Sequence, residues 1–343
     1  MGAALALSAR GRGRTAPNPN VGCIIVRDGR VVGRGWTQPG GRPHAEAMAL
    51  AEAGDAAAGA KVYVTLEPCA HASPRGPACA DLLVAARPAR VVAALTDPDP
   101  RTAGAGFARL RAAGIAVVED VLAADARRGM AGFLTRRARG RPHVTLKLAT
   151  SLDGAIARAD GESKWITGAE ARAHAHLERS RHEAILVGRG TFDADAPRLD
   201  VRLPGLGARA PRRLVLTRHA GPVPASTAAP GDAAADPAVR WTPEQVRGDE
   251  GWEVIPDPAA VSALIDVDHL LVEGGAVTAS AFLAADLVDR LLLYRAPILI
   301  GGGRPAIGDI GLASLAAAHG RWRVVDARAL GSDRLEVYER ARD

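Results

Sequence analysis

Three residues of types that bind zinc stand within one short stretch of the sequence. His44 begins a His-Ala-Glu, Cys69 follows a proline, and another cysteine stands at Cys79. One histidine and two cysteines can hold a catalytic Zn²⁺ that keeps its fourth position for water. Glu46, two residues after the histidine, can move protons to and from that water without binding the metal. This H-x-E, P-C, C pattern is typical of zinc deaminases that act on nucleobases.

A structural zinc site is the main alternative for the same residues. Structural sites normally have four protein ligands, and His71 can supply the fourth. A chance grouping is disfavoured because the glutamate and the proline of the pattern are both present. Nine residues separate the two cysteines, more than in the usual C-x-x-C, so the motif alone does not define the substrate.

Alternating strands and helices are predicted to position these residues. We expect a helix from Pro43 with His44 and Glu46 in its first turn, and another with Cys79 near its start. Helix N-termini favour thiolate over thiol. Strands are expected at 21–27, 30–36, 61–66, 90–95 and 115–118, and further helices at 2–10, after 104–106 and at 123–137. This alternation predicts a three-layer α/β domain.

A domain boundary is predicted at Gly140-Arg141-Pro142, so that residues 1–140 and 141–343 form separate domains. Strands are expected at 143–149, 184–187, 213–216, 269–272, 290–295, 297–300, 322–325 and 334–338. Helices are expected after Thr167-Gly168 and from Ala276. Residues 220–251 are rich in Pro, Ala, Gly and Asp, which indicates an exposed insertion with little regular structure.

Two features of the second half could carry chemistry. Glu273-Gly274-Gly275 ends an apolar strand and opens a helix, where backbone N–H groups can approach a phosphate. An ordinary strand-to-helix turn is an equally good interpretation. Lys147, one of only three lysines, lies in an otherwise apolar strand. It could face a phosphate or a ribose, or could be a solvent-facing residue of an edge strand.

Composition excludes several classes of function. The chain has 343 residues, 48% of them hydrophobic, and a net charge of +6. Of its 44 lysine and arginine residues, 41 are arginine. The arginines are spread along the chain without interleaved aromatic residues, so we expect no nucleic-acid partner. No run of about 18 apolar residues exists, and the basic residues at the N-terminus follow its apolar run. We therefore expect no membrane segment, no secretory signal and a cytoplasmic location.

The three cysteines do not suggest a disulfide framework. Two of them belong to the metal pattern, and Cys23 lies in an apolar strand where we expect it to be buried.

The chain resembles the bifunctional riboflavin-biosynthesis deaminase–reductase family over nearly its whole length. The motifs that carry the resemblance are PNPNVGCIIVRDGRVVGRGW, PHAE, YVTLEPCAH, DPDP, VTLKLATSLDG, GESKWITG and VEGG. The resemblance implies a cytidine-deaminase-like three-layer α/β/α domain followed by a dihydrofolate-reductase-like α/β domain. It also implies Zn²⁺, NADPH, a pyrimidine ribosyl phosphate as the small-molecule substrate, and a homo-oligomer, either dimer or tetramer.

Roles for individual residues of the first domain follow from the resemblance. The zinc ligands would be His44, Cys69 and Cys79, and Glu46 would be the catalytic proton shuttle. The positions that would contact the pyrimidine or the phosphate are Asn18, His71, Arg75 and Asp97. An amide can bind a pyrimidine edge and an arginine can hold a phosphate. As alternatives, Asn18 between prolines could be a turn residue and Asp97 a loop cap.

Roles in the second domain follow in the same way. The residues that would contact NADPH are Ala149, Trp165, Thr191, Asp195 and the loop that begins at Gly275. Those that would contact the ribosyl phosphate are Ser163, Arg179, Leu199, Arg202 and Glu273. The resemblance also strengthens the interpretation of Lys147 as a substrate-binding residue. Both arginines suit a phosphate, although a solvated face is the alternative in so arginine-rich a chain.

The sequence departs from the family pattern at several places. Thr37 stands where a histidine is usual, Asp99 where an asparagine is usual, and the loop between the two zinc cysteines is one residue longer, which displaces Arg75. In the second half, Ala196 replaces an aspartate and Thr217-Arg218 replaces Asp-Ser. The changes at Ala196 and Thr217-Arg218 support one alternative, an active deaminase with a degenerate reductase domain that acts as a scaffold. A second alternative is a nucleic-acid-editing zinc deaminase with a fused accessory domain, which the absence of a localised basic or aromatic surface disfavours.

Overall fold

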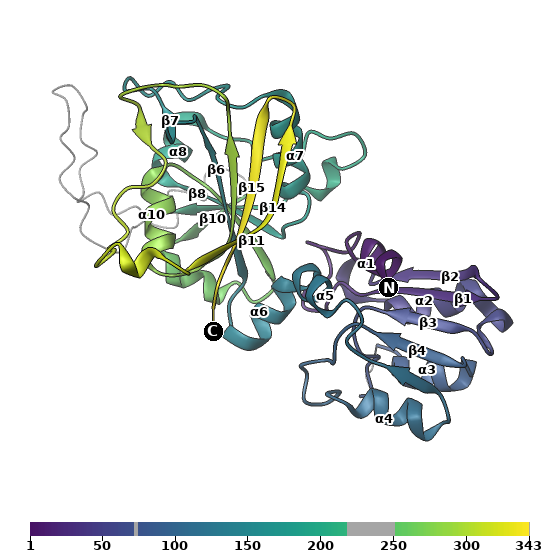
Figure 1. Cartoon of the computed structure of the whole chain (residues 1–343). Helices are drawn as coiled ribbons and strands as arrows, with labels where there is room; N and C mark the ends of the chain where they lie inside the picture. Colours follow the sequence, from purple (N-terminus) through teal and green to yellow (C-terminus); the bar gives the residue numbers. More distant parts are fainter. Residues whose placement is uncertain (72–74, 218–250, 343) are drawn as a thin grey trace. The chain divides into compact units, whose positions relative to one another are not determined.

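The computed structural model describes residues 1–71, 75–217 and 251–342. The chain divides into two compact units (Figure 1). The first comprises Met1–Pro142 together with Ile265–Asp268, and the second comprises His143–Leu264 and His269–Asp343. Among the described residues, no helix combines the length and the apolar character that crossing a membrane requires.

The first unit is built on a five-stranded sheet of order β2-β1-β3-β4-β5. Its strands are β1 (Gly22–Arg27), β2 (Arg30–Trp36), β3 (Lys61–Val64), β4 (Arg90–Ala93) and β5 (Ala116–Val118). β1 pairs antiparallel with β2 and with β3, while β3, β4 and β5 run parallel. The carboxyl ends of β3 and β4 therefore lie at the same edge of the sheet.

Helices cover both faces of this sheet. They are α1 (Gly2–Ser8), α2 (Ala45–Ala53), α3 (Cys79–Ala86), α4 (Ala105–Ala112), α5 (Ala123–Gly129) and α6 (Ala131–Arg139). α1 packs on β1 and α5, and α2, α3 and α4 pack side by side. A Cβ on Gly35 would lie 2.0 Å from the Ala45 carbonyl oxygen, so glycine is what lets α2 approach β2 so closely. The three-layer prediction is confirmed.

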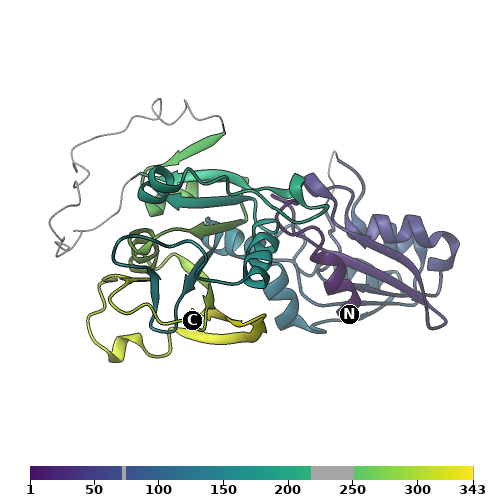
Figure 2. The same ribbon diagram turned by 90° about the horizontal axis from the view of Figure 1, so that it is seen from above.

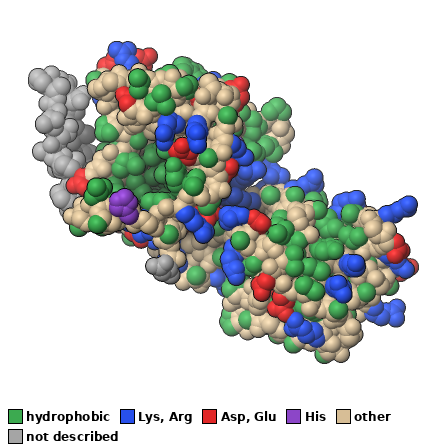
Figure 3. All heavy atoms as spheres, viewed as in Figure 1, with side chains coloured by type: hydrophobic (Ala, Val, Ile, Leu, Met, Phe, Trp, Pro, Cys, Tyr) green, Lys and Arg blue, Asp and Glu red, His purple; other side chains and the backbone are tan. Residues whose placement is uncertain are grey.

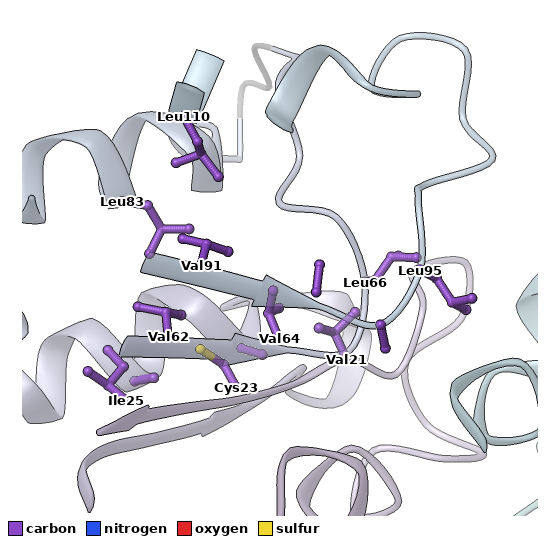
Figure 4. Close-up of a cluster of buried hydrophobic side chains, with 14 of the residues drawn as sticks. Val21, Cys23, Ile25, Val62, Val64, Leu66, Leu83, Val91, Leu95 and Leu110 are labelled. Carbon is purple, nitrogen blue, oxygen red and sulfur yellow. The ribbon is translucent and has the colours of Figure 1, made fainter. Parts of the chain in front are cut away.

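The core of this unit uses small aliphatic side chains, as the low aromatic content requires (Figure 4). Cys23, Val62 and Val64 on the strands lie beneath Leu83 and Leu110 on the helices, and all are fully buried. Cys23 is a free cysteine inside this core, which confirms its predicted burial.

The single helix predicted for 123–137 is wrong. It is two helices, α5 and α6, because the backbone of Met130 leaves the helical region with φ −109° and ψ 21°. Met130 is 1% exposed, so burial of its side chain accompanies the break.

The second unit contains an eight-stranded sheet of order β10-β9-β8-β11-β6-β12-β15-β14. Its strands are β6 (His143–Thr150), β8 (Ala184–Gly188), β9 (Arg212–Leu216), β10 (Trp252–Ile255), β11 (His269–Glu273), β12 (Val288–Arg295), β14 (Trp322–Leu330) and β15 (Asp333–Arg340). The first six in spatial order are parallel, β15 pairs antiparallel with β12, and β14 pairs antiparallel with β15. A separate pair joins β7 (Ala155–Ala157) to β13 (Arg304–Pro305).

Helices α7 (Ala169–Arg179), α8 (Arg189–Asp195) and α10 (Ala276–Ala284) belong to this unit, and Figures 1 and 2 show α7 and α10 against its sheet. Short 3₁₀ turns occur in the two units at Pro39–Gly41, Gly54–Ala57, Gly207–Arg209, Pro258–Ala263 and Ala316–Ala318. The mixed α/β fold predicted for this half is confirmed.

The second half differs from the sequence-based prediction in two ways. The strand expected at 297–300 is absent, because the backbone N–H groups of Ile300 and Gly301 donate to the Asp153 carboxylate instead of to a strand. The strands β7 and β10 and the helix α8 were not anticipated. The insertion predicted at 220–251 and Arg218 lie outside the described residues, except for Gly251.

Candidate active sites

The predicted zinc ligands converge in the first unit. The ligand atoms of His44, Cys69 and Cys79 all lie within 4.8 Å of one another. The His44 Nδ1 is 3.3 Å from the Cys79 Sγ and 3.7 Å from the Cys69 Sγ. A nitrogen and two sulfurs grouped in this way fit a tetrahedral Zn²⁺ whose fourth position stays open.

Three different elements bring these ligands together. His44 is the residue before α2 and has extended backbone geometry, Cys79 is the first residue of α3, and Cys69 lies in the loop after β3. The backbone N–H of Cys79 donates to the Cys69 Sγ at 3.3 Å. The side-chain amide of Asn18 lies 3.1 Å from the His44 Nε2 and donates to the Gly41 carbonyl at 3.2 Å. Such outer contacts fix the orientation of a ligating imidazole.

Glu46 and the thiols have unusual acidity in the metal-free site. Burial raises the pKa of Glu46 to about 7. The hydrogen bond with Cys79 lowers the pKa of the Cys69 thiol to about 4, and the same bond together with burial raises the pKa of Cys79. A carboxyl that titrates near neutral pH is well suited to take up and release a proton.

A cavity of about 240 Å³ opens beside the zinc ligands. His44, Glu46 and Cys69 line it. The four residues predicted to contact the deaminase substrate line it as well: Asn18, His71, Arg75 and Asp97. Cys79 completes the metal group without lining this cavity. The structure thus brings the complete predicted set of the first domain together.

His71 is not part of the metal group, because among the described residues only three ligands gather there. Its Nδ1 lies 3.2 Å from the Thr102 hydroxyl. The alternative interpretation, a structural zinc site with His71 as its fourth ligand, is therefore wrong. Arg75 donates to the Gly40 carbonyl at 2.8 Å. Burial raises the pKa of Asp97 to about 6, although the Asp99 backbone N–H donates to its carboxylate at 2.9 Å and acts in the opposite direction.

Glu67 is a buried residue of this cavity that the sequence reasoning missed. Its carboxylate accepts hydrogen bonds from four backbone N–H groups at 2.9–3.2 Å, those of Asp97, Gly104, Gly106 and Phe107. It is 2% exposed. This one side chain holds the loop after β4 and the start of α4 against the active site. A charged residue at the end of a buried strand was the available signal.

A second cavity, of about 380 Å³, lies in the second unit. All eleven residues predicted for the reductase site line it: Lys147, Ala149, Ser163, Trp165, Arg179, Thr191, Asp195, Leu199, Arg202, Glu273 and Gly275. They come from β6, α7, α8, the end of β11 and the loops between them. Ligands in open parallel sheets bind at the carboxyl ends of the strands, and Glu273 ends β11.

Glu273 is the electrostatic centre of the second cavity. Arg179 donates to both of its carboxylate oxygens, at 2.8 and 2.9 Å, and the Lys147 Nζ lies 3.9 Å away. Burial alone would raise the pKa of Glu273, but the charge and hydrogen bonds of Arg179 lower it to about 2. The Arg179 side chain is only 15% exposed, so the solvated-face alternative is wrong for it. Lys147 lies on the interior strand β6, not on an edge strand.

The walls of this cavity fit an anionic dinucleotide. Gly274 and Gly275 precede α10, where free backbone N–H groups favour phosphate. Trp165 exposes 73% of its surface and has the Arg172 guanidinium stacked 4.5 Å from its ring centre. Arg172 and His176 also line the cavity. Sequence reasoning missed both, although each lies on α7 with the predicted Arg179.

Two departures from the family pattern have clear structural consequences. Thr37 is 1% exposed, and its hydroxyl accepts a hydrogen bond from the Val21 backbone at 3.0 Å. It therefore joins two strands at the wall of the first cavity. Ala196 ends α8 with φ +38°, a left-handed conformation that aspartate adopts more easily than alanine.

Comparison with known proteins agrees with both sites. Residues 1–95 match the cytidine and deoxycytidylate deaminase zinc-binding region, and residues 142–335 match the RibD C-terminal domain. The riboflavin biosynthesis protein RibD of Escherichia coli strain K12 is 40% identical, over 97% of this chain and 96% of that protein. Its counterpart in Mycobacterium tuberculosis strain H37Rv is 41% identical, over 98% and 95%.

Solved structures show the same relationship. RibD of Acinetobacter baumannii superposes with a TM-score of 0.82 at 36% identity, covering 100% of this chain and 98% of that one. A deaminase/reductase from Thermotoga maritima superposes with a TM-score of 0.82 at 31% identity, over 99% and 97%.

The fold and the two cavities define an enzyme that joins a zinc deaminase to a reductase. The chain belongs to the RibD family, the bifunctional deaminases and reductases of riboflavin biosynthesis. Zn²⁺ serves its deaminase and NADPH its reductase.

Proposed function

We propose that the substrate is 2,5-diamino-6-ribosylamino-4(3H)-pyrimidinone 5′-phosphate. Residues 1–140 remove its 2-amino group by hydrolysis, and residues 141–343 then reduce the ribosyl group to ribityl. The observation that carries this proposal is the pair of complete sites. One cavity holds the zinc ligands beside a buried Glu46, and the other holds the cluster of Lys147, Arg179 and Glu273.

In the deaminase site, Zn²⁺ supplies a water activated near neutral pH when it is bound. Glu46 would take up a proton from water in this cavity and deliver it to the leaving amine, a role that suits its pKa of about 7. Asn18 lies at the cavity wall beside His44, where its amide can bind the pyrimidine edge. Arg75 supplies positive charge at the same wall for the phosphate.

In the reductase site, NADPH supplies the hydride. Glu273 stays ionised at neutral pH and fixes Arg179 and Lys147 around it. Two cations so arranged can bind the oxygens of the ribosyl phosphate, and Arg202 at the rim adds a third. Ala149, Thr191, Asp195 and the loop at Gly275 provide the wall for the dinucleotide.

The test follows both steps in one reaction with the full-length protein loaded with zinc. NADPH absorbance and ammonia release are measured for the wild type, Glu46→Gln and Lys147→Met. The wild type should release ammonia and then consume NADPH. Glu46→Gln should do neither, because no deaminated product forms. Lys147→Met should release ammonia normally but consume NADPH more slowly.

Glu52→Gln is the matched control for the first step, because Glu52 lies exposed on the same helix as Glu46 and pairs with Arg34 on the surface. It should behave as the wild type does. A wild-type protein with bound zinc that releases no ammonia would refute the proposed substrate. Ammonia without NADPH loss would refute the second step.

We also propose that the chain works in the cytoplasm as a homodimer or homotetramer. Its three cysteines are free, which suits a reducing compartment. Figure 3 shows a hollow on the second unit lined by hydrophobic side chains. An open groove of this unit is lined by Leu148, Leu291, Leu293 and Ile307, and a second copy could cover it. Light scattering that gives the monomer mass of 35.5 kDa would refute the assembly, and cell fractionation tests the location.

A further inference from the structure

Two arginines at the first cavity share one buried carboxylate. Asp99, the residue that departs from the usual asparagine, is 6% exposed and lines the cavity with Arg101 and Arg137. The Arg101 Nε donates to the Asp99 Oδ1 at 2.9 Å and its Nη2 to Oδ2 at 2.5 Å. The Arg137 Nη2 lies 3.5 Å from the same Oδ2. The carboxylate thus draws both guanidinium groups to one point of the wall.

Both arginines keep donors for a further anion. Asp99 engages only part of the five N–H donors of Arg101, and the side chains of Arg101 and Arg137 are 61% and 46% exposed. Arg137 is also held by the ring of Phe133, 5.4 Å from its guanidinium carbon. Because their positions are fixed before a ligand arrives, the two side chains lose little conformational freedom when they bind one.

The arginines of this wall determine the kind of ligand. Arg42 and Arg75 line the same cavity, so its lining has four guanidinium groups, together with the carboxyl groups of Glu46, Glu67, Asp97 and Asp99. Asp99 carries one negative charge and the two arginines beside it carry two positive charges, so the group of Asp99, Arg101 and Arg137 has a net positive charge. Guanidinium groups bind phosphate oxygens through paired hydrogen bonds, and two of them together match a phosphate dianion.

We infer that Arg101 and Arg137, positioned by Asp99, form a phosphate subsite of the deaminase cavity. This subsite selects phosphorylated substrates over their dephosphorylated ribosides. The inference rests on the proposed function, because the substrate named there carries the 5′-phosphate. Asp99 acts through the arginines and is a positioning residue.

The experiment compares the wild type with Arg101→Gln, Arg137→Gln and the double variant, all full-length and loaded with zinc. Ammonia release is measured with the nucleotide and with its riboside. Each single variant should have a KM for the nucleotide about tenfold higher than that of the wild type, because it lacks one guanidinium group that hydrogen-bonds to the phosphate. The kcat, and all kinetics with the riboside, should change by less than about twofold. Inorganic phosphate should inhibit the variants more weakly.

Arg109→Gln is the matched control. Arg109 also pairs with an aspartate, Asp81 at 2.7 Å, but neither residue lines the cavity. Its KM values should equal those of the wild type. Unchanged nucleotide KM in the double variant would overturn the inference, and so would equal increases for nucleotide and riboside, because these would indicate a general structural effect.

Calorimetric titration of inorganic phosphate separates this inference from the proposed function. Phosphate binding that is weaker in the double variant than in the wild type supports the subsite even if the wild type deaminates neither compound. Deamination of the nucleotide with no difference in phosphate binding or KM between the two proteins would keep the proposed function and reject the subsite.

Discussion

Replacing Glu67 by glutamine should destabilise the deaminase unit strongly. The glutamate carboxylate accepts four backbone N–H donors, two on each oxygen. Glutamine keeps one acceptor oxygen, so at least two of these N–H groups would face its NH₂ group without an acceptor. A buried donor left without a partner costs roughly 1–3 kcal/mol. We therefore expect a loss of about 4 kcal/mol in the free energy of unfolding.

Differential scanning calorimetry of the full-length protein measures this effect. The transition of the deaminase unit is identified as the one that moves when zinc is removed. For a unit of this size, 1 kcal/mol corresponds to roughly 3–4 °C in Tm, so Glu67→Gln should lower that transition by about 14 °C. The transition of the reductase unit should stay in place.

Glu52→Gln again provides the control, because Glu52 is an exposed glutamate whose partner Arg34 is also exposed. Exposed ion pairs contribute about 0–1 kcal/mol, so its Tm should change by less than about 3 °C. If Glu67→Gln lowers Tm no more than this control does, the carboxylate does not hold the loop after β4, and the reasoning from its four hydrogen bonds is refuted.

Two further predictions concern pH. In metal-free protein, Glu46 has a pKa of about 7, above its value in the unfolded chain. As the pH rises from about 4.5 to 7, the free energy of unfolding of the wild type should therefore fall by about 3 kcal/mol relative to that of Glu46→Gln. Denaturant titrations at several pH values measure this difference, and parallel pH profiles of the two proteins would contradict the prediction. Glu273→Gln should destabilise the reductase unit by about 3 kcal/mol at pH 7, because Arg179 would stay buried without its carboxylate. The pKa of Glu273 is lowered to about 2. The difference in unfolding free energy between the wild type and Glu273→Gln should therefore be complete above about pH 4.5 and vanish as the pH falls toward 2. Thermal unfolding of both proteins at several pH values measures it.

The zinc site could be predicted from sequence because its chemistry is local. His44 and Glu46 are two residues apart at a helix start, and each cysteine follows a recognisable strand or precedes a helix. The role of Glu67 could not be predicted in this way. Its four partners lie 30–40 positions later in the chain, and no local pattern indicates that they return to the same point.

The reductase site shows a different limit. Lys147, Arg179 and Glu273 come from three elements, and only the parallel pairing of β6 with β11 places Glu273 directly beside Lys147. From the residues alone, Lys147 and Arg179 could each have been solvent-exposed, and Glu273 could have been part of an ordinary strand-to-helix turn. The family resemblance supplied the grouping, and the structure supplied its reason, since a buried carboxylate must have cations around it. The break at Met130 escaped prediction because alanine and arginine on either side of it favour helix, and the flanking Gly129 and Gly132, which disfavour helix, were given too little weight.

The departures from the family pattern fall where compensation is available. A histidine, asparagine or aspartate in a cavity wall contributes a hydrogen bond or charge that a neighbour can replace. Thr37 still ties β1 to β2 through its hydroxyl. An aspartate at position 99 adds a buried negative charge, which is tolerable only with cations beside it, and Arg101 and Arg137 provide them. The zinc ligands have no such freedom, because a metal site needs its donor atoms at fixed distances. Variation in this enzyme should therefore change substrate selection at the cavity rim before it changes the reaction at the metal.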